Sequence, residues 1–406
     1  MKPMSDYSFI RGIHLSNMPP IRPQNRPNFG AGPGARRREV IPLDLQLDYC
    51  EKLNINSHRQ FGDYTIYYAD PEACIEFYRD TIRKCWSRGV STMQILFSGN
   101  SLDPAILEPS WWEEKGDDYV RAMVTALKDE PGLLMWDIMN EPSCNNWMRD
   151  SGENRPIYWE KINAFLEHYC KLVKELDPEG CITIGHTVPA DIEPSAAWVD
   201  VISFHDYTET RARINNAYQT ALAYGEKYGI PVINSEMCCL CRANPYDVAI
   251  EIAMNYNVGF YVFNLISEGY WGEVHGLIYP DGTVRDPAGV AAMYGFFRNR
   301  GPNRIKAKPN REGFVYTALK FLEESLTDTT GLFNNIPRTA DEVLEAAEFA
   351  ANLMEANEMV PMINPPSAQI LDWRAMPLEE REKHIEEIRA FAYNLGKILK
   401  EYCQVL

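Results

Sequence analysis

The sequence lacks any apolar run that approaches the length needed to cross a membrane. Its first residues, Met1 to Tyr7, also lack the apolar core of a secretion signal. Ten cysteines without such a signal are typical of reduced thiols, so we expect a cytoplasmic protein that is not embedded in a membrane.

Positive charge is scarce. Lys and Arg total 40 against 57 Asp and Glu, which gives a formal net charge of −17 at pH 7. Nucleic acids and anionic membranes attract basic surfaces, so neither is expected as a partner. The balance favours a neutral or cationic ligand.

The signatures of common cofactors and metals are missing as well. The glycine-rich stretch Gly30 to Gly34 has the wrong spacing for a dinucleotide turn, and its proline would spoil a helix start. Cys238, Cys239 and Cys241 lie close together without a Cys-x-x-Cys partner. Reduced structural thiols are therefore favoured over a zinc site or a disulfide to Cys144. We expect no cofactor and no metal.

Segments of strand length alternate with amphipathic helices along most of the chain. Strands are predicted at 8–15, 55–61, 90–97, 133–140, 181–186, 199–205, 231–236 and 258–265, and a long loop at 98–116. Strands separated by helices pair in parallel, and eight such units are the count of a (β/α)₈ barrel of the α/β class. An open doubly wound sheet is the alternative.

The pattern changes near Gly301. Beyond a linker-like stretch, helices without intervening strands are predicted at 314–325, 340–357 and 378–402. We predict a catalytic barrel over residues 1–300 and a helical extension over 301–406. The extension would pack on the barrel or form the interface of a homo-oligomer.

Two glutamates end buried strands. Asn140-Glu141-Pro142 follows an apolar run that its proline terminates, and Glu236 ends the predicted strand 231–236. The carboxyl ends of barrel strands form the active-site face, where apolar walls tend to raise a carboxyl pKa and would suit Glu141 to act as an acid. A structural ion pair is the alternative for a single glutamate. A pair of carboxylates is what hydrolysis of a glycosidic bond requires.

On these residues the chain resembles the clan A glycoside hydrolases, and most closely glycoside hydrolase family 5, the cellulase and mannanase family, from residue 8 to about residue 300. Asn140-Glu141-Pro142 matches the acid/base motif of strand four, and Glu236 matches the nucleophile of strand seven. His205-Asp206-Tyr207 and Asn56-Ser57-His58-Arg59 match the motifs of strands six and two.

The resemblance implies a role for each matching residue. Glu141 would be the general acid/base and Glu236 the nucleophile, while Asn140 would donate to the sugar 2-hydroxyl. Arg59 and Tyr207 would orient Glu236, and a cation beside it would keep its pKa low.

Other residues of the predicted cleft have less specific signals. His205 and His14 stand at strand ends and are expected in the cleft, with satisfied core histidines as the alternative. Asp137 is expected to be an interior residue bonded to Arg or His. The family has a tryptophan at the end of strand eight, where this chain has Phe263 or Asn264, so Trp271 in the next loop is expected to be the sugar platform.

The resemblance implies a retaining β-glycosidase that acts on oligosaccharides or glycosides, and the expected absence of a secretion signal favours action on chain ends. The predicted separation of the two carboxyl groups is about 5–5.5 Å. The alternatives are an endo-β-1,4-glucanase or mannanase of the same family and, from another class, a barrel that binds glycans without cleaving them. The sugar configuration stays open.

Overall fold

The computed structural model describes residues 2–17, 19, 41–98, 102–239, 244–267, 274–297, 311–326, 338–356, 359–360 and 364–405. The chain divides into two compact units, Met1–Val290 and Ala291–Leu406. Among the residues described, no helix is both long and apolar enough to cross a membrane.

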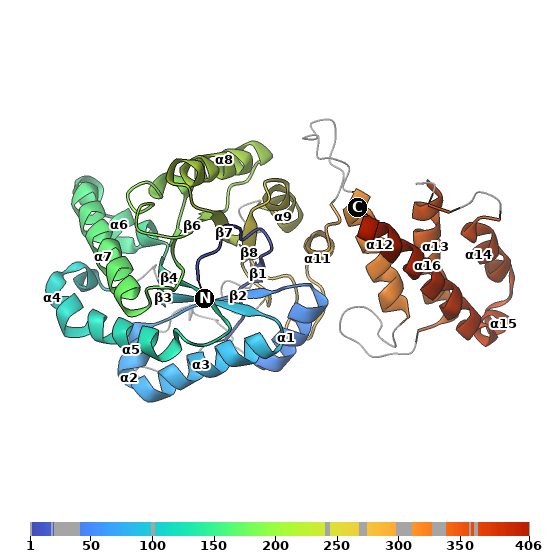
Figure 1. Ribbon diagram of the computed structural model, residues 1–406, viewed down its shortest axis with the longest axis horizontal. Coiled ribbons are helices and arrows are strands. Elements are labelled where there is room, and N and C mark those ends of the chain that lie inside the picture. Colours follow the sequence, from blue (N-terminus) through green and yellow to red (C-terminus); the bar gives the residue numbers. More distant parts are fainter. Residues whose placement is uncertain are drawn as a thin grey trace. The chain divides into compact units, whose positions relative to one another are not determined.

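The first unit is a closed barrel of eight parallel strands in sequence order (Figure 1). The last strand pairs with the first, with Tyr261 opposite Gly12, which closes the barrel. This confirms the predicted (β/α)₈ fold, and every predicted strand segment overlaps one strand. The strands are β1 (Arg11–Ile13), β2 (Ser57–Gln60), β3 (Ser91–Phe97), β4 (Leu133–Asn140), β5 (Ile182–His186), β6 (Ile202–Asp206), β7 (Val232–Met237) and β8 (Gly259–Val262).

Helices surround these strands (Figure 1). Asp70 caps α3 (Pro71–Ser87), because its side chain accepts the backbone N–H of Ala73 and Pro71 occupies the first helical position. The main helices are α1 (Leu43–Lys52), α2 (Tyr64–Ala69), α3 (Pro71–Ser87), α5 (Asp117–Leu127), α7 (Arg155–Leu176), α8 (Arg211–Tyr228), α9 (Tyr246–Asn255) and α11 (Pro287–Met293).

The predicted long loop at 98–116 is only partly a loop. It contains η1 (Pro104–Leu107), α4 (Pro109–Trp111) and the π-helical turn η2 (Trp112–Gly116). The expectation was wrong because Trp111 and Trp112 pack against the barrel core, and this packing orders the segment into short helical turns.

A large part of the core lies between β3, β4 and the helices α3, α5 and α7. Phe97 at the end of β3 is fully buried, and its ring centroid lies 4.8 Å from that of Tyr169 and 5.0 Å from that of Phe165, both on α7. Such contacts fix α7 against the carboxyl half of the barrel, next to the strand that leads to Glu141.

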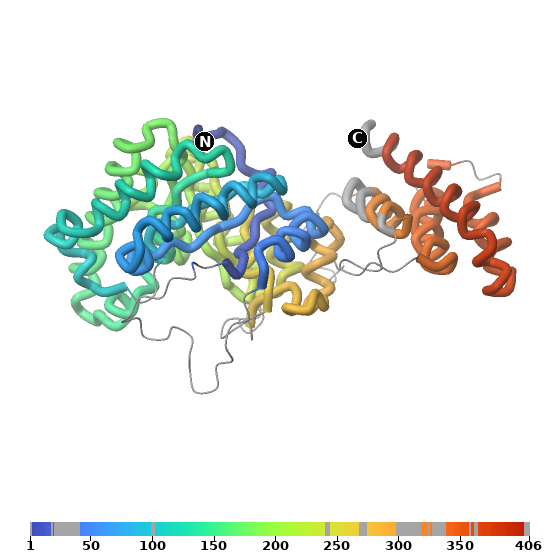
Figure 2. Tube along the Cα trace, turned by 90° about the horizontal axis from the view of Figure 1, so that it is seen from below, coloured from blue at the N-terminus to red at the C-terminus, as the bar shows by residue number. Residues whose placement is uncertain are grey.

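The second unit has a hydrophobic core of its own. Its described residues form helices only, coloured orange to red in Figure 2. They are α12 (Arg311–Ser325), α13 (Ala340–Ala356), α14 (Pro366–Ala375), α15 (Leu378–Lys383) and α16 (Ile385–Val405). The predicted packing of this unit on the barrel or on a second copy stays a prediction.

The predicted helix 378–402 is not continuous, since it is interrupted at His384. Arg381 pairs with Asp341 of α13 and donates to the carbonyl oxygen of Met376. These bonds tie α15 to α13 and to the residue that follows α14, which the helical period alone does not reveal.

Phe97→Ala is expected to lower the free energy of unfolding of the barrel by about 3–5 kcal/mol, because a fully buried ring is replaced by a cavity. Urea denaturation followed by circular dichroism measures this. Phe9→Ala is the control, since Phe9 is 46% exposed and its loss should cost about 0.5 kcal/mol or less. Equal losses for the two variants would contradict the assignment of Phe97 to the core.

Candidate active site

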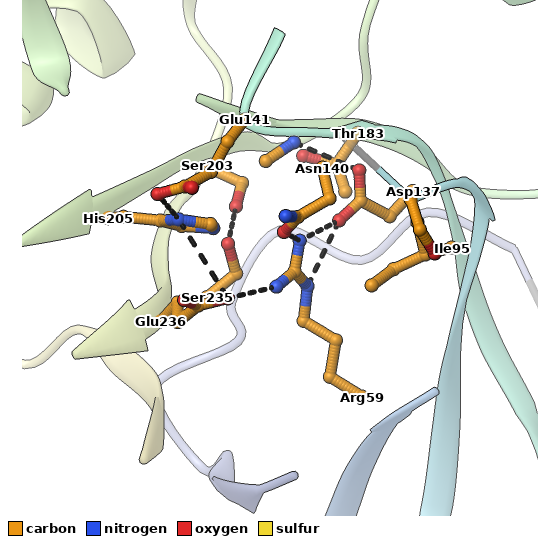
Figure 3. Close-up of polar contacts among 12 residues, drawn as sticks. Arg59, Ile95, Asp137, Asn140, Glu141, Thr183, Ser203, His205, Ser235 and Glu236 are labelled. Carbon is orange, nitrogen blue, oxygen red and sulfur yellow. Dashed lines mark hydrogen bonds and ion pairs between the residues drawn. The ribbon is translucent and has the colours of Figure 1, made fainter. Parts of the chain in front are cut away.

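The two glutamates lie at the carboxyl end of the barrel, on either side of β6 (Figure 3). Glu236 belongs to β7 and is paired in register with His205 of β6. Glu141 follows β4 and adopts left-handed backbone angles, φ 46° and ψ 61°. A non-glycine residue rarely adopts this conformation, and such local strain is common where a side chain must point into a site.

Backbone hydrogen bonds fix the turn at Glu141. Its N–H donates to the carbonyl oxygen of Gly185 in β5 at 2.8 Å, and its own carbonyl oxygen accepts the N–H of Cys144 at 2.9 Å. The Ser143 hydroxyl in the same turn donates to the Asp191 carboxylate at 2.6 Å. The acid side chain therefore projects from a backbone that is anchored to the neighbouring strand and to the loop beyond it.

His205 lies between the two carboxylates. Its Nδ1 is 3.0 Å from Oε1 of Glu141 and 3.9 Å from Oε2 of Glu236. One oxygen of each glutamate and a ring nitrogen of His205 all lie within 4.8 Å of one another, and all three residues are buried. Two acids this close cannot ionise independently, because a proton bound to one of them changes the pKa of the other.

Both oxygens of Glu236 are hydrogen-bonded. Arg59 of β2 donates from Nη1 to Oε2 at 2.9 Å, and the Tyr207 hydroxyl donates to Oε1 at 2.7 Å. The orientation of this carboxylate is therefore fixed from two sides.

Arg59 is fully buried and contacts two further side chains. Its Nε and Nη2 donate to Oδ2 of Asp137 at 3.0 and 2.6 Å, and Nη2 also donates to Oδ1 of Asn140 at 2.8 Å. The expectation that Asp137 is an interior residue bonded to an arginine is confirmed. Because the oxygen of Asn140 is occupied by Arg59, its amide N–H groups remain to donate to a ligand.

His14 lies behind the carboxylates and is 2% exposed. Its Nε2 is 3.3 Å from the backbone oxygen of Ser235, and its ring centroid is 5.2 Å from that of Phe61 and 5.0 Å from that of Phe263. Burial, followed by the charge of Arg59, lowers the pKa of His14 well below its usual value, so the ring is neutral.

Two aromatic side chains that the sequence analysis did not predict for the site, Phe61 and His275, pack near His14 and Phe263. The ring centroid of His275 is 4.8 Å from that of Phe263, and its Nδ1 is 2.7 Å from the backbone oxygen of Cys238. Phe61 carried a usable signal because it follows β2 directly, whereas His275 stands in a loop and had none. Trp271, the expected sugar platform, falls outside the described residues.

The pKa directions in the site oppose two expectations. Burial acts to raise the pKa of Glu141, but the hydrogen bond and charge of His205, with the charge of Arg59, leave it below its usual value. Burial raises the pKa of Glu236, and the charge of Glu141 adds to this rise. His205, Arg59 and the Tyr207 hydroxyl lower it without cancelling the rise.

Glu141, His205 and Glu236 are close enough together to ligate a metal ion, so the fit must be tested on their surroundings. The guanidinium of Arg59 lies 2.9 Å from Oε2 of Glu236 and would repel a cation bound there. The site therefore does not fit a divalent metal. Among the described residues, Cys238 and Cys239 are buried and no disulfide joins them to Cys144.

The fold and the site together define a class. A (β/α)₈ barrel with two buried carboxylates at the carboxyl end of its strands is the architecture of many glycoside hydrolases. Residues 109–269 match the family described as cellulase (glycosyl hydrolase family 5). The matched residues include Glu141, His205 and Glu236. The match confirms the resemblance to that family and the prediction of a glycoside hydrolase.

Individual relatives are distant. The probable mannan endo-1,4-beta-mannosidase C of Aspergillus terreus is 32% identical over 72 residues, which are 16% of this chain and 17% of that protein. A crystal structure of a glycoside hydrolase superposes with a TM-score of 0.50 at 14% identity, over 71% of this chain and 98% of the other. An exo-beta-1,4-mannosidase from Opitutaceae bacterium strain TAV5 gives a TM-score of 0.49 at 14% identity, over 76% and 70% of the two chains.

The charge of Arg59 is expected to keep divalent cations out of the site. Wild-type protein should show no saturable Mn²⁺ binding by electron paramagnetic resonance, whereas Arg59→Met, which removes the cation, should gain a site that Glu141→Gln abolishes in the double variant. Mn²⁺ suits carboxylate and imidazole ligands and avoids the thiols elsewhere in the chain. Saturable Mn²⁺ binding to the wild type that His205→Ala removes would contradict the argument.

Proposed function

We propose that the protein hydrolyses β-linked oligosaccharides or glycosides with retention of anomeric configuration. The observation that supports this best is the distance between the carboxylates, since an oxygen of Glu141 and an oxygen of Glu236 lie within 4.8 Å. An inverting enzyme keeps its carboxyl groups roughly 6.5–9.5 Å apart to admit a water molecule, whereas a retaining enzyme keeps them about 5–5.5 Å apart.

Glu236 is the nucleophile of this proposal. Its carboxylate oxygen attacks the anomeric carbon while Glu141 protonates the departing glycosidic oxygen, so that one C–O bond forms as the other breaks. Glu141, now ionised, takes a proton from water, and that water releases the sugar from Glu236. The assignment rests on the two donors that orient Glu236 and on Asn140, which directly precedes Glu141.

The pKa of Glu236 is raised by burial, and that of Glu141 is lowered by His205 and Arg59. Catalysis by this mechanism needs the reverse arrangement. His205 contacts Glu141 and lies 3.9 Å from Glu236, so its Nδ1 stands where a proton can be exchanged between them. Substrate then completes the transfer, because a glycosidic oxygen beside Glu141 favours the protonated form of that acid.

Asn140 can contribute to recognition of the sugar. Its oxygen accepts from Arg59, so its N–H groups face the ligand side and can donate to a sugar hydroxyl. A hydrogen bond at the 2-position strengthens as positive charge develops on the ring.

The substrate class follows from the fungal relative, whose name describes action on mannan. We propose β-1,4-linked manno-oligosaccharides as the first substrates, with attack at the chain end. The endo-acting alternative is distinguished by the products of a β-1,4-mannohexaose digest, because an exo enzyme releases monosaccharide from the outset and an endo enzyme releases internal fragments first.

The roles are tested with activated aryl β-glycosides of several configurations and the variants Glu141→Ala and Glu236→Ala. Azide should rescue both variants, because it replaces the missing group. Glu141→Ala should yield the β-glycosyl azide, since azide attacks the glycosyl-enzyme on Glu236. Glu236→Ala should yield the α-glycosyl azide by a single direct displacement.

Two outcomes would overturn the proposal. An α-azide from Glu141→Ala and a β-azide from Glu236→Ala would exchange the two roles. Wild-type protein that binds manno-oligosaccharides and leaves every glycoside of the panel intact would instead support the glycan-binding barrel.

A further inference from the structure

Arg59 is a single cation shared by three partners, and the partners are unequal. Asp137 accepts two of the four contacts, from Nε and Nη2, while Glu236 and Asn140 accept one each. Figure 3 shows the guanidinium between Glu236 on one side and Asp137 with Asn140 on the other. The strongest constraint on the plane of the guanidinium therefore comes from a residue that does not itself reach the substrate.

The hydrogen bonds to Asp137 fix the direction in which each N–H group of Arg59 points. With Nε and Nη2 both directed at Oδ2 of Asp137, the planar fork can present only Nη1 to Glu236. Without Asp137 the guanidinium could rotate out of the orientation in which Nη1 reaches Glu236 and Nη2 reaches Asn140.

The backbone of β5 completes this arrangement at Gly185. Its N–H donates to Oδ1 of Asp137 at 2.9 Å, and its carbonyl oxygen accepts the N–H of Glu141. A Cβ at this position would lie 2.5 Å from Nη2 of Arg59 and 2.9 Å from Oδ2 of Asp137. One residue thus connects Asp137 to the acid/base turn, and its surroundings leave no room for a side chain.

The negative charge of Asp137 has a second effect on Arg59. Arg59 and Asp137 are both fully buried, and Asp137 neutralises the guanidinium from the side away from the two glutamates. Less of the positive charge is then available to lower the pKa of Glu236.

We propose that Asp137 is a positioning residue of the reaction, which fixes the fork of Arg59 so that one N–H orients Glu236 and another orients Asn140, and which balances the charge of Arg59. The proposal rests on the proposed function of the same site. Asp137 acts only through Arg59, and Gly185 is the backbone position that holds it.

Asp137→Asn tests the proposal, because it keeps the size of the side chain and removes its charge. We expect kcat on an aryl β-glycoside to fall about 100-fold with little change in KM, as for a small misplacement of reacting groups. A negative charge raises the pKa of a nearby carboxyl, so its removal should also shift the acid limb of the kcat/KM profile to lower pH. A merely structural role would leave that limb in place.

Two further variants separate position, charge and stability. Gly185→Ala displaces the fork and keeps the charge, so kcat should fall without a shift of the acid limb. Glu130→Gln is the matched control, because Glu130 precedes β4 at its other end and pairs with Arg83 at 2.7 Å, far along the strand from Glu141. It should lower stability alone and leave kcat and the pH profile unchanged.

A crystal structure of Asp137→Asn provides a readout that needs no substrate. We expect Nη1 of Arg59 to leave hydrogen-bond distance of Glu236. An unmoved Arg59, or an Asp137→Asn enzyme as active as the wild type with the same acid limb, would overturn the positioning role while the proposed function stands. Loss of the Arg59–Glu236 bond in a protein whose wild type cleaves no glycoside would instead support the positioning role and refute the function.

Discussion

The buried guanidinium of Arg59 is the interaction on which the arrangement of the site depends. It bonds to Asp137, Asn140 and Glu236, which come from β4 and β7, while Arg59 itself comes from β2. A cation with no solvent exposure is costly unless its donors are paired, and here every contact also orients a group of the site. The hydrogen bonds that offset the cost of burying the charge are therefore the same bonds that orient the groups of the site.

The second constraint is the mutual influence of two acids in one buried space. The charge of Glu141 raises the pKa of Glu236, and Nδ1 of His205 lies 3.0 Å from an oxygen of the first and 3.9 Å from an oxygen of the second. The protonation of the pair is therefore a property of the whole group, including Arg59 and Tyr207, and not of either glutamate alone. This explains why the pKa shifts of Glu141 and Glu236 can differ from the roles that geometry assigns to them.

The sequence predicted the barrel because eight strands alternate with helices, whereas the pairing of β8 with β1, which excludes an open sheet, comes from the structure. From the resemblance of its motifs to those of family 5, it predicted Arg59, Asn140, Glu141, His205, Tyr207 and Glu236 as residues of one site. It could not predict the order of the two pKa values, which is a small difference between burial and several opposing charges whose distances no motif encodes. It also missed His275, which reaches the site from a loop, and the break at His384, where the apolar period of the helix continues across the interruption.

The most direct test of the account is to trap the covalent intermediate. A dinitrophenyl 2-deoxy-2-fluoro-β-glycoside of the preferred sugar forms a glycosyl-enzyme that is hydrolysed slowly, because fluorine destabilises the positive charge of both transition states. Digestion and mass spectrometry should locate the sugar on Glu236. A label on Glu141, or turnover with inversion and no covalent adduct, would contradict the account.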